Sequence, residues 1–316
     1  MRNSEKLVEL SIIIVNWNTK TLLYECLKSI YEKVSGFIYE VTVVDNASTD
    51  GSIKMVRQNF PQVKLIENKE NLGFAKANNQ AIKLIKNCTY VLLLNSDVVI
   101  KNEIIQKLME FLEKNPNAGV VGPALRMPDG KLQKGGVAGY FPSLLTGFNY
   151  FFFLSILFSN VFKGIYINQS PYVKKKKVTE VDWIAGTCLM TRLEIIKKVG
   201  KLDESIFMYT EEIEWCKRVK NKGWKNFYLP HAEVTHHLWG SQKGISGKGI
   251  KALLQYVLYN HGIAISVIFR LITFLGLWIR FIIYSLYFIF SGNQKYRNKS
   301  RQMYIFALNA LKRKFN

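Results

Sequence analysis

The stretch that decides the fold is Thr89-Tyr90-Val91-Leu92-Leu93-Leu94-Asn95-Ser96-Asp97. An apolar run of strand length stops there at a polar tripeptide whose last member is a carboxylate. Such a run predicts a strand that is buried on both faces, as in a parallel sheet. Ligands of open α/β sheets bind outside the carboxyl ends of the strands, so we expect Asp97 at the rim of a crevice. Its carboxylate would suit a divalent cation and, through the cation, a phosphate-bearing substrate. The alternative is a polar turn that caps the next helix.

The residues before this stretch alternate between strand-like and helix-like patterns. The strand-like apolar runs are 11–15, 39–44 and 63–66. Apolar residues at helical spacing follow them, at about 22–30, 52–59 and 75–85. This rhythm predicts an α/β fold, with a mostly parallel sheet, right-handed crossovers and flanking helices. Each strand ends in a polar cluster, so polar side chains should collect along one edge of the sheet. That expectation favours a binding site over a helix cap at Asp97.

The sequence lacks the usual glycine-rich phosphate loops. The Gly-x-Gly-x-x-Gly pattern of dinucleotide-binding proteins is absent, and so is the Gly-x-x-x-x-Gly-Lys-Ser/Thr loop. A phosphate group bound at the sheet edge must therefore be neutralised by a metal ion or by side chains. The absence of these loops supports the prediction of a metal at Asp97.

The net charge of +21 is spread unevenly along the chain. No Asp or Glu occurs after Glu233, and the basic residues of that tail flank apolar stretches rich in Phe, Tyr, Trp and Ile. A basic tail can bind nucleic acid or an anionic membrane surface, and the apolar flanks favour the membrane. The basic residues of the tail are Lys243, Lys248, Lys251, Arg270, Arg280, Lys295, Arg297, Lys299, Arg301, Lys312, Arg313 and Lys314.

An uncharged region lies between Lys134 and Lys163, and its most apolar part is 144–162. It approaches the ~20 apolar residues of a membrane-spanning helix. Polar residues interrupt it, and a single span there would put Asp97 and the later acidic cluster on opposite sides of a bilayer. We therefore predict a membrane-dipping helix or a flap on the acceptor side, with a buried core helix or a true span as alternatives. The lysines at 174–177 would then face anionic head groups.

A second apolar region extends from Leu253 to Phe290 and is cut by Arg270 and Arg280. The uncharged pieces are too short for two clean spans. They predict two interfacial helices whose cations snorkel to the surface, followed by a final basic amphipathic segment at about 302–315. The expected organisation is a catalytic domain over 1–245, with an apolar insertion at about 140–175, and a membrane-associating helical region over 246–316.

Eight pieces of the sequence resemble, in order, the family 2 glycosyltransferases with the GT-A fold. The branch in question is the rhamnosyltransferase-type enzymes of bacterial surface polysaccharide assembly, and the likeness covers roughly residues 9–262. Each piece alone is weak, and their order makes the resemblance specific. The pieces are 15–18 (VNWN), 44–52 (VDNASTDGS), 71–75 (NLGFA), 94–97 (LNSD), 183–190 (WIAGTCLM), 203–209 (DESIFMY), 211–218 (EEIEWCKR) and 230–236 (PHAEVTH).

The resemblance implies a site for a nucleotide-diphosphate sugar. Asp45 would accept a hydrogen bond from the base or ribose, and Asp97 would be the final carboxylate of a DxD-type motif that holds Mn²⁺ or Mg²⁺ on the diphosphate. Asn95 replaces the first Asp of that motif. His236 matches a further metal ligand, and His237 is its rival. The implied donor-binding residues are Val15, Asn16, Asn18, Asp45, Asn71, Gly73, Lys76, Asn95, Ser96 and Asp97.

The resemblance also implies a catalytic base in the acidic cluster at 211–214. Inverting transfer needs a base for the acceptor hydroxyl, and burial or a neighbouring like charge would raise a carboxyl pKa towards neutral. The family pattern is Glu-Asp-x-Asp, so Glu212 takes the base position and Glu211 is the runner-up. A solvated charge run at a helix start is the structural alternative. Arg218 would either pair with an acid on its helix or assist the leaving diphosphate.

The acceptor side is implied at Trp183, Gly186 and Thr187. An exposed Trp is a platform for a sugar face, and a buried core Trp is the alternative.

The expected function is therefore an inverting glycosyltransferase at the cytoplasmic face of the cell membrane, held there peripherally or monotopically. Resemblance alone suggests dTDP-L-rhamnose as donor. The apolar segment at 144–162 and the basic tail suggest a membrane-bound acceptor, for which we expect a polyprenyl-diphosphate-linked saccharide. One alternative is a metal-dependent nucleotidyltransferase, which would need an early basic Gly-rich loop that the chain lacks. Another is a non-catalytic nucleotide-sugar-binding or scaffold protein, a reading that Asn95 favours.

Overall fold

A computed structural model describes residues 8–101, 103–159, 161–237 and 247–312. Within these ranges the chain forms two units. The first, here the sheet unit, comprises 8–138 and 169–237, and the second, here the helical unit, comprises 139–168 and 247–312. The apolar insertion expected at about 140–175 thus falls mainly in the helical unit. The domain boundary expected at 245 lies outside the described residues.

Four parallel strands form one half of the main sheet, in the order β3-β2-β1-β4. Side chains in the centre of β1 and β4 are fully or almost fully buried, as the apolar runs predicted. A helix follows each of the first three strands, which confirms the predicted α/β alternation. The elements are β1 (Val8–Asn16), α1 (Lys20–Lys33), β2 (Tyr39–Asp45), α2 (Ser52–Asn59), β3 (Lys64–Glu67), α3 (Gly73–Leu84) and β4 (Cys88–Asn95).

The other half of the sheet mixes parallel and antiparallel strands, in the order β4-β10-β6-β11-β5, with β8 also paired to β11. β10 runs antiparallel to β4, and β11 is parallel to β6. The turn at Ser96 and Asp97 leads into β5 instead of a helix, so the helix-cap alternative is wrong. The elements of this half and the helices around it are β5 (Val98–Val99), α4 (Ile104–Lys114), β6 (Ala118–Arg126), α7 (Gln169–Lys174), β8 (Thr179–Val181), β10 (Cys188–Arg192), α8 (Leu193–Val199), α9 (Glu211–Asn221) and β11 (Lys225–His236). β7 (Ala138–Gly139) and β9 (Trp183–Ile184) pair outside the main sheet.

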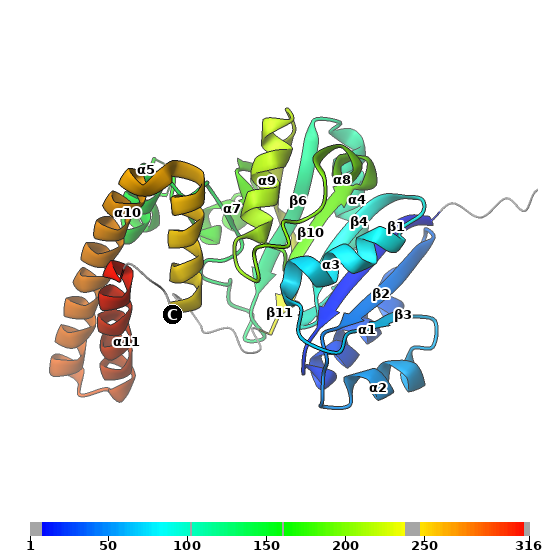
Figure 1. Cartoon of the computed structure of the whole chain (residues 1–316), viewed down its shortest axis with the longest axis horizontal. Helices are drawn as coiled ribbons and strands as arrows, with labels where there is room; N and C mark the ends of the chain where they lie inside the picture. The colour runs from blue at the N-terminus through cyan, green and yellow to red at the C-terminus, as the bar shows by residue number, and fades with distance from the viewer. Residues whose placement is uncertain (1–7, 102, 160, 238–246, 313–316) are drawn as a thin grey trace, which may run out of the picture. The chain divides into compact units, whose positions relative to one another are not determined.

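Helices α3, α8 and α9 lie in front of the sheet (Figure 1). The buried Asn79 of α3 ties this layer together, because its amide donates to the carbonyl of Leu202 at 2.8 Å and accepts from the Leu202 N–H at 3.1 Å. Helix α4 packs against β6, β10 and β11.

The helical unit contains α5 (Leu144–Phe151), α6 (Leu154–Leu157), α10 (Gly247–Ser291) and α11 (Gln294–Leu311). α10 is two helices joined at Gly262, whose φ of 79° and ψ of 178° are not helical. Figure 1 shows α11 lying alongside the second part of α10. The two run antiparallel, since Tyr284 stacks on Tyr296 near the turn and Arg270 donates to the carbonyl of Ala310 at the other end.

The apolar segment at 144–162 does not form a spanning helix. α5 has eight residues and α6 has four, with Phe153 in the left-handed region (φ 66°) between them. Eight residues of helix extend about 12 Å, well short of the ~30 Å hydrocarbon core of a bilayer. The span alternative is therefore wrong for this segment. Among the described residues, α10 alone has the length and apolar composition of a membrane-crossing helix.

The prediction for 253–290 was right in having two helices and wrong about Arg280. The break falls at Gly262, and Arg280 does not snorkel, because its side chain is 5% exposed. Its guanidinium donates to the carbonyls of Tyr150 and Phe151, at the end of α5, and to that of Gly276. Tyr150 and Phe151 are the last residues of α5, where the carbonyls lack the helical N–H four residues on, so the guanidinium takes the place of water there. The final helix also begins earlier than predicted, at Gln294.

Candidate active site

The polar ends of β1, β2 and β4 lie side by side. In the register of the parallel pairs, Asn16 is opposite Asp45, and Val15 is opposite Asn95. The carboxyl ends of the three central strands therefore bring together residues that are far apart in the sequence. This confirms that the polar clusters collect along one edge of the sheet.

A chain of hydrogen bonds links these strand ends. The Thr19 hydroxyl donates to Asn16 Oδ1 at 2.6 Å, and it lies 2.8 Å from Ser96 Oγ. Since the single hydroxyl proton of Thr19 goes to Asn16, Ser96 donates to Thr19. The Asn16 amide then donates to Asp45 Oδ2 at 2.7 Å and to Ser48 Oγ at 3.0 Å. These hydrogen bonds fix the ends of β4, β1 and β2 relative to one another. Thr19 and Ser48 were not among the predicted site residues.

Asp45 is enclosed by this network. Its side chain is 1% exposed, and its Oδ1 accepts from the Ser48 N–H at 2.7 Å. In this arrangement the carboxylate holds the turn after β2, and contact with a base or ribose would require that turn to open. The neighbouring Asn18 is in the left-handed region (φ 53°) and accepts from the Thr49 N–H. Between the two strand ends, Trp17 is 54% exposed and offers a flat apolar surface that the sequence-based list omitted.

The predicted donor residues at the start of α3 form a tight turn. Asn71 Oδ1 accepts from the Gly73 N–H at 3.0 Å, and Gly73 has a φ of 80°. A Cβ at Gly73 would lie 2.5 Å from the carbonyl oxygen of Phe207, so only glycine fits. The Phe74 N–H donates to that same carbonyl at 3.1 Å. The turn is therefore locked against the loop before α9, while Lys76 is exposed in the first turn of α3.

Asp97 and His236 meet because β5 pairs antiparallel with β11. Val98 is opposite His236 in this pair, so the residue just before β5 faces the end of β11. Asp97 Oδ1 lies 3.2 Å from His236 Nε2, and both side chains are buried. His237 presents its backbone N–H, and not its ring, to the carbonyl of Asp97 at 2.9 Å. The pairing thus favours His236 over His237 as the partner of Asp97.

The Asp97–His236 pair fits a divalent cation. Two ligand atoms at right angles on an ion, each about 2.1 Å away, lie about 3 Å apart, close to the 3.2 Å separation here. A carboxylate oxygen and an imidazole nitrogen also suit Mn²⁺. No third His, Cys, Asp or Glu side chain joins them among the described residues. Further ligands would therefore come from the substrate or from water. The Asn95 N–H donates to the carbonyl of Thr187 at 3.0 Å, so this backbone contact is structural.

Glu211 and Glu212 open α9, as predicted; Glu211 is buried and Glu212 is half-buried. Glu211 is 4% exposed and accepts from the Thr210 N–H at 2.8 Å. Burial and the charge of Glu212 raise the pKa of Glu211 well above its ordinary value. Glu212 Oε2 is buried and has no hydrogen-bond partner in the described part of the chain. Burial raises the pKa of Glu212 to about 7, which suits a general base at neutral pH.

Two roles were considered for Arg218, pairing with an acid on its helix and assisting the leaving diphosphate, and its contacts are those of the first. It pairs with Glu214 one turn earlier, with Nε 2.7 Å from the carboxylate. Its remaining N–H groups donate to the carbonyls of Val199 and Lys201. The guanidinium therefore fastens α9 to the end of α8 and is not directed at a substrate.

The predicted acceptor residues are buried, which corrects the role given to Trp183. Its side chain is 1% exposed and lies in the core, so its ring offers no face to a sugar. Gly186 is needed for packing, because a Cβ there would lie 2.9 Å from the Phe74 ring. Thr187 is 9% exposed and uses its carbonyl to hold Asn95. The exposed apolar side chains near α9 are instead Phe207 and Met208, to which the sequence analysis gave no role.

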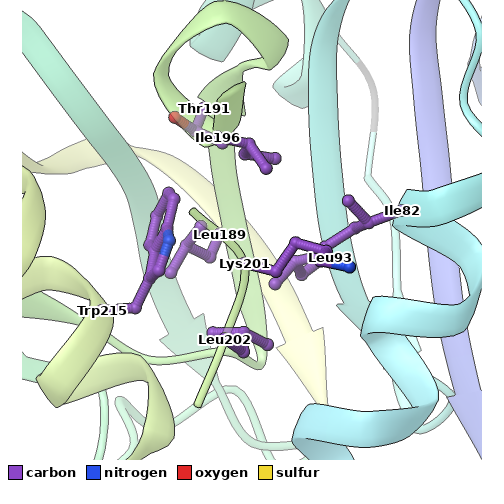
Figure 2. Close-up of a pocket in the computed structure, with 8 residues that line it drawn as sticks. All are labelled: Ile82, Leu93, Leu189, Thr191, Ile196, Lys201, Leu202 and Trp215. Atoms are coloured by element: carbon purple, nitrogen blue, oxygen red, sulfur yellow. The ribbon is translucent and has the colours of Figure 1, made fainter. Parts of the chain in front are cut away.

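A small cavity in the sheet unit is not part of this site. It measures about 10 Å³, room for one water molecule at most, and its lining is mainly apolar. Figure 2 shows its lining side chains, among them Leu93, Leu189 and Trp215. It is a packing gap between the sheet and the helices in front of it.

The sequence is similar to known glycosyltransferases. The model for "Glycosyl transferase family 2" matches residues 11–199. The N-acetylglucosaminyl-diphospho-decaprenol L-rhamnosyltransferase of Mycobacterium tuberculosis is 30% identical over 207 residues, which cover 62% of this chain and 66% of that protein, just under two thirds. Rhamnosyltransferase WbbL of Escherichia coli is 25% identical, over 67% of this chain and 78% of its own length.

Solved structures share the fold at lower identity. The mannosyltransferase PcManGT from Pyrobaculum calidifontis, in complex with GDP-Man and Mn²⁺, aligns with a TM-score of 0.54 and 15% identity, over 97% of this chain and 86% of its own. S. aureus TarS 1-349 aligns with a TM-score of 0.52 and 14% identity, over 96% and 81%. The sheet and its helices thus have the GT-A fold. Because the family model covers more than half of its length, the chain belongs to glycosyl transferase family 2.

Proposed function

We propose that this protein is a membrane-associated inverting glycosyltransferase that moves a sugar from a nucleotide-diphosphate donor to a lipid-linked saccharide in cell-surface polysaccharide synthesis. The observation that carries the proposal is the Asp97–His236 pair at the strand ends, in a family 2 chain in which Glu212 Oε2 is a buried carboxylate oxygen without a hydrogen-bond partner in the described residues. We propose L-rhamnose from dTDP-L-rhamnose as the transferred sugar, because the relatives are named rhamnosyltransferases.

The donor would lie along the polar edge of the sheet. Asp97 Oδ1 and His236 Nε2 would hold Mn²⁺ or Mg²⁺, which supplies positive charge to the diphosphate when bound. The turn at Asn71 and Gly73 and the exposed Lys76 would border the donor at the start of α3, where helix N–H groups favour anions. The buried Asn16–Asp45–Ser48 network would fix the strand ends on the nucleoside side.

Glu212 would take the acceptor proton. The acceptor oxygen attacks the anomeric carbon as the bond from that carbon to the diphosphate oxygen breaks, and the configuration inverts. The hydroxyl proton passes to Glu212 Oε2, which is the buried oxygen without a partner. A carboxyl pKa of about 7 leaves much of this group ionised at neutral pH and still basic enough to accept a proton.

The helical unit supports a lipid-linked acceptor and an anionic membrane surface as partners. It contains no Asp or Glu, and its surface carries large apolar side chains. At the turn between α10 and α11, residues 284–301 combine exposed aromatic and basic side chains, the composition of a membrane interface. Tyr287, Ile289 and Phe290 are 56%, 70% and 85% exposed. We propose peripheral or monotopic association at the cytoplasmic face.

Incubation of the full chain with a panel of nucleotide-diphosphate sugars, Mn²⁺ and a polyprenyl-diphosphate-linked saccharide tests the proposal. Release of nucleoside diphosphate, with the sugar's mass added to the lipid, is the expected result, and Glu212→Gln is the inactive control. Release of pyrophosphate with a nucleotidyl product would favour the nucleotidyltransferase alternative. Tight donor binding with no product from any donor would favour a non-catalytic protein.

A further inference from the structure

The ring of His236 is held from behind by Gln133. His236 Nδ1 lies 2.7 Å from Gln133 Oε1, and both side chains are buried. The orientation of the Gln133 amide is set independently, because its Nε2 donates to the carbonyl of Gly135 at 3.0 Å. Its Oε1 is therefore the acceptor, and the hydrogen of the contact belongs to His236 Nδ1.

This contact determines which histidine nitrogen faces Asp97. With the hydrogen on Nδ1, Nε2 of the neutral ring carries a lone pair and points at Asp97 Oδ1, 3.2 Å away. A lone pair and a carboxylate oxygen facing each other are both acceptors, and a cation between them satisfies both. Gln133 thus selects the tautomer that presents Nε2 to a metal ion.

Gln133 is itself fixed by Gln169. The Gln169 amide donates to the Gln133 carbonyl at 2.8 Å, and its Oε1 accepts from the buried Tyr228 hydroxyl at 2.8 Å and from the Leu125 N–H at 3.1 Å. The Gln133 N–H donates to the carbonyl of Leu125 at 2.9 Å. All these groups belong to the sheet unit. A buried polar chain therefore runs from Tyr228 through two glutamines to His236 and Asp97.

We propose that Gln133 is a positioning residue that fixes the tautomer and ring orientation of His236 for the metal, and that Gln169 acts one step behind it. The proposal rests on the metal-binding role given to Asp97 and His236 under the proposed function. Partners behind a metal-bound histidine orient the ring and make it more basic, and their loss typically costs about 10- to 100-fold in metal affinity. The assignment adds two residues that touch neither donor nor acceptor.

The first test measures Mn²⁺ affinity by electron paramagnetic resonance of free Mn²⁺, with dTDP present and no sugar donor. Gln133→Leu should weaken binding by about 10- to 100-fold. Gln133→Glu should restore it, because a carboxylate accepts the Nδ1 hydrogen. Gln169→Leu should weaken it less than Gln133→Leu. The matched control is Thr191→Val, which removes another buried hydrogen bond of the sheet, to the Gly119 carbonyl, and should leave affinity unchanged.

The second test needs neither metal nor turnover. Long-range ¹⁵N–¹H correlation of the wild-type imidazoles, with His236 assigned by its loss in His236→Asn, should show the Nδ1–H tautomer. The Nε2–H tautomer would overturn the proposal, and so would wild-type Mn²⁺ affinity in a folded Gln133→Leu. If Gln133→Leu does not fold, the proposal is decided by the tautomer of the wild-type His236 ring and by the Mn²⁺ affinity of Gln133→Glu. Because sugar transfer is not measured, failure here leaves the transferase proposal standing, and absence of transfer leaves these readouts intact.

Discussion

The two units use charge in opposite ways. All 23 acidic residues lie in the sheet-unit part of the sequence, whereas residues 139–168 and 242–316 contain thirteen of the 44 Lys and Arg residues and no acid. All but five of the exposed large apolar side chains in the described residues also belong to the helical unit. In the sheet unit, polar side chains are tied into hydrogen-bond chains at chosen positions. The helical unit instead combines basic residues and exposed apolar side chains with no acid, which suits contact with an extended anionic and apolar surface.

Arg280 and Asp97 show the same difference at the level of single residues. Asp97 is buried beside a side chain of complementary chemistry, His236. Arg280 is equally buried, but its unit has no acid, so backbone carbonyls and the Phe153 ring, 4.0 Å from the guanidinium carbon, surround it. The carboxyl end of α5 supplies partial negative charge where a carboxylate is missing. A buried charge can thus be stabilised by a specific partner or by the end of a helix.

The largest effect is expected from Asp97→Ala. Removing the carboxylate of the proposed metal pair should lower sugar transfer by about 10⁴-fold, because a metal contributes several kcal/mol to stabilising developing charge. Steady-state transfer with a fixed Mn²⁺ concentration measures it. Asp129→Ala is the matched control, since this exposed acid of the same unit pairs with the nearby Lys131 and lies outside the proposed site. Equal loss in both variants would mean that the position of Asp97 beside His236 does not matter for transfer.

Glu212→Gln should reduce kcat by about 10³-fold while the affinity for the nucleotide stays unchanged. The amide keeps the shape of the side chain and cannot accept the acceptor proton, and general bases contribute about 10²- to 10⁴-fold. Transfer kinetics and titration of dTDP separate the two quantities. Turnover near that of the wild type would assign the base elsewhere, with Glu211→Gln as the next variant to measure.

The double variant Lys295→Gln and Arg297→Gln should weaken binding to vesicles rich in anionic lipid by about 30-fold. Each cation near such a surface contributes about 1 kcal/mol. Flotation at physiological salt measures the effect, and the difference should shrink at high salt. The control pair is Lys114→Gln and Lys131→Gln, two exposed lysines of the sheet unit that pair with acids. If both pairs weaken binding equally, net charge alone explains the attachment.

The smallest effect concerns pH. Because the pKa of Glu212 is raised to about 7, kcat should rise about tenfold per pH unit below that value and level off above it. The same shift acts on stability with the opposite sign. The folded protein binds this proton more tightly than the unfolded chain, so the free energy of unfolding should fall as pH rises from about 4.5 to about 7. Denaturant titrations of the wild type and Glu212→Gln, at both ends of this range, should show a smaller slope in the variant, where buried Glu211 is the remaining carboxyl with a raised pKa in α9.

The parts of the fold that depend on local pattern were predictable. The apolar runs at 11–15, 39–44 and 63–66 lie in or overlap β1, β2 and β3, and the 22–30 pattern lies within α1. Their alternation dictated the parallel half of the sheet. The kink at Gly262 was missed, because an isolated glycine in a helical pattern is usually tolerated.

The contacts of the site depend on partners distant in sequence. Asp97 was predicted from a strand end, whereas Gln133 is 103 residues from His236 and has no local signature. Thr19 similarly reaches Ser96 across 77 residues. Trp183 could not be assigned, because the same aromatic residue serves as a sugar platform or as core. Arg280 was misplaced since its carbonyl partners come from a helix about 130 residues earlier.

The helical unit is assembled from two separated stretches of chain, and this affects its synthesis. α5 packs against α10 through glycines, with Gly147 against the Phe269 ring and Gly276 against Phe151. At about 5–20 residues per second, a ribosome that has completed α5 needs on the order of ten seconds to produce Phe269. During that interval Phe151, which is 1% exposed in the complete fold, lacks Phe269 and Gly276 of the helix that packs on it. We expect nascent-chain chaperones or the membrane itself to shield it. A shortened chain that ends before α10 would leave α5 in that state permanently.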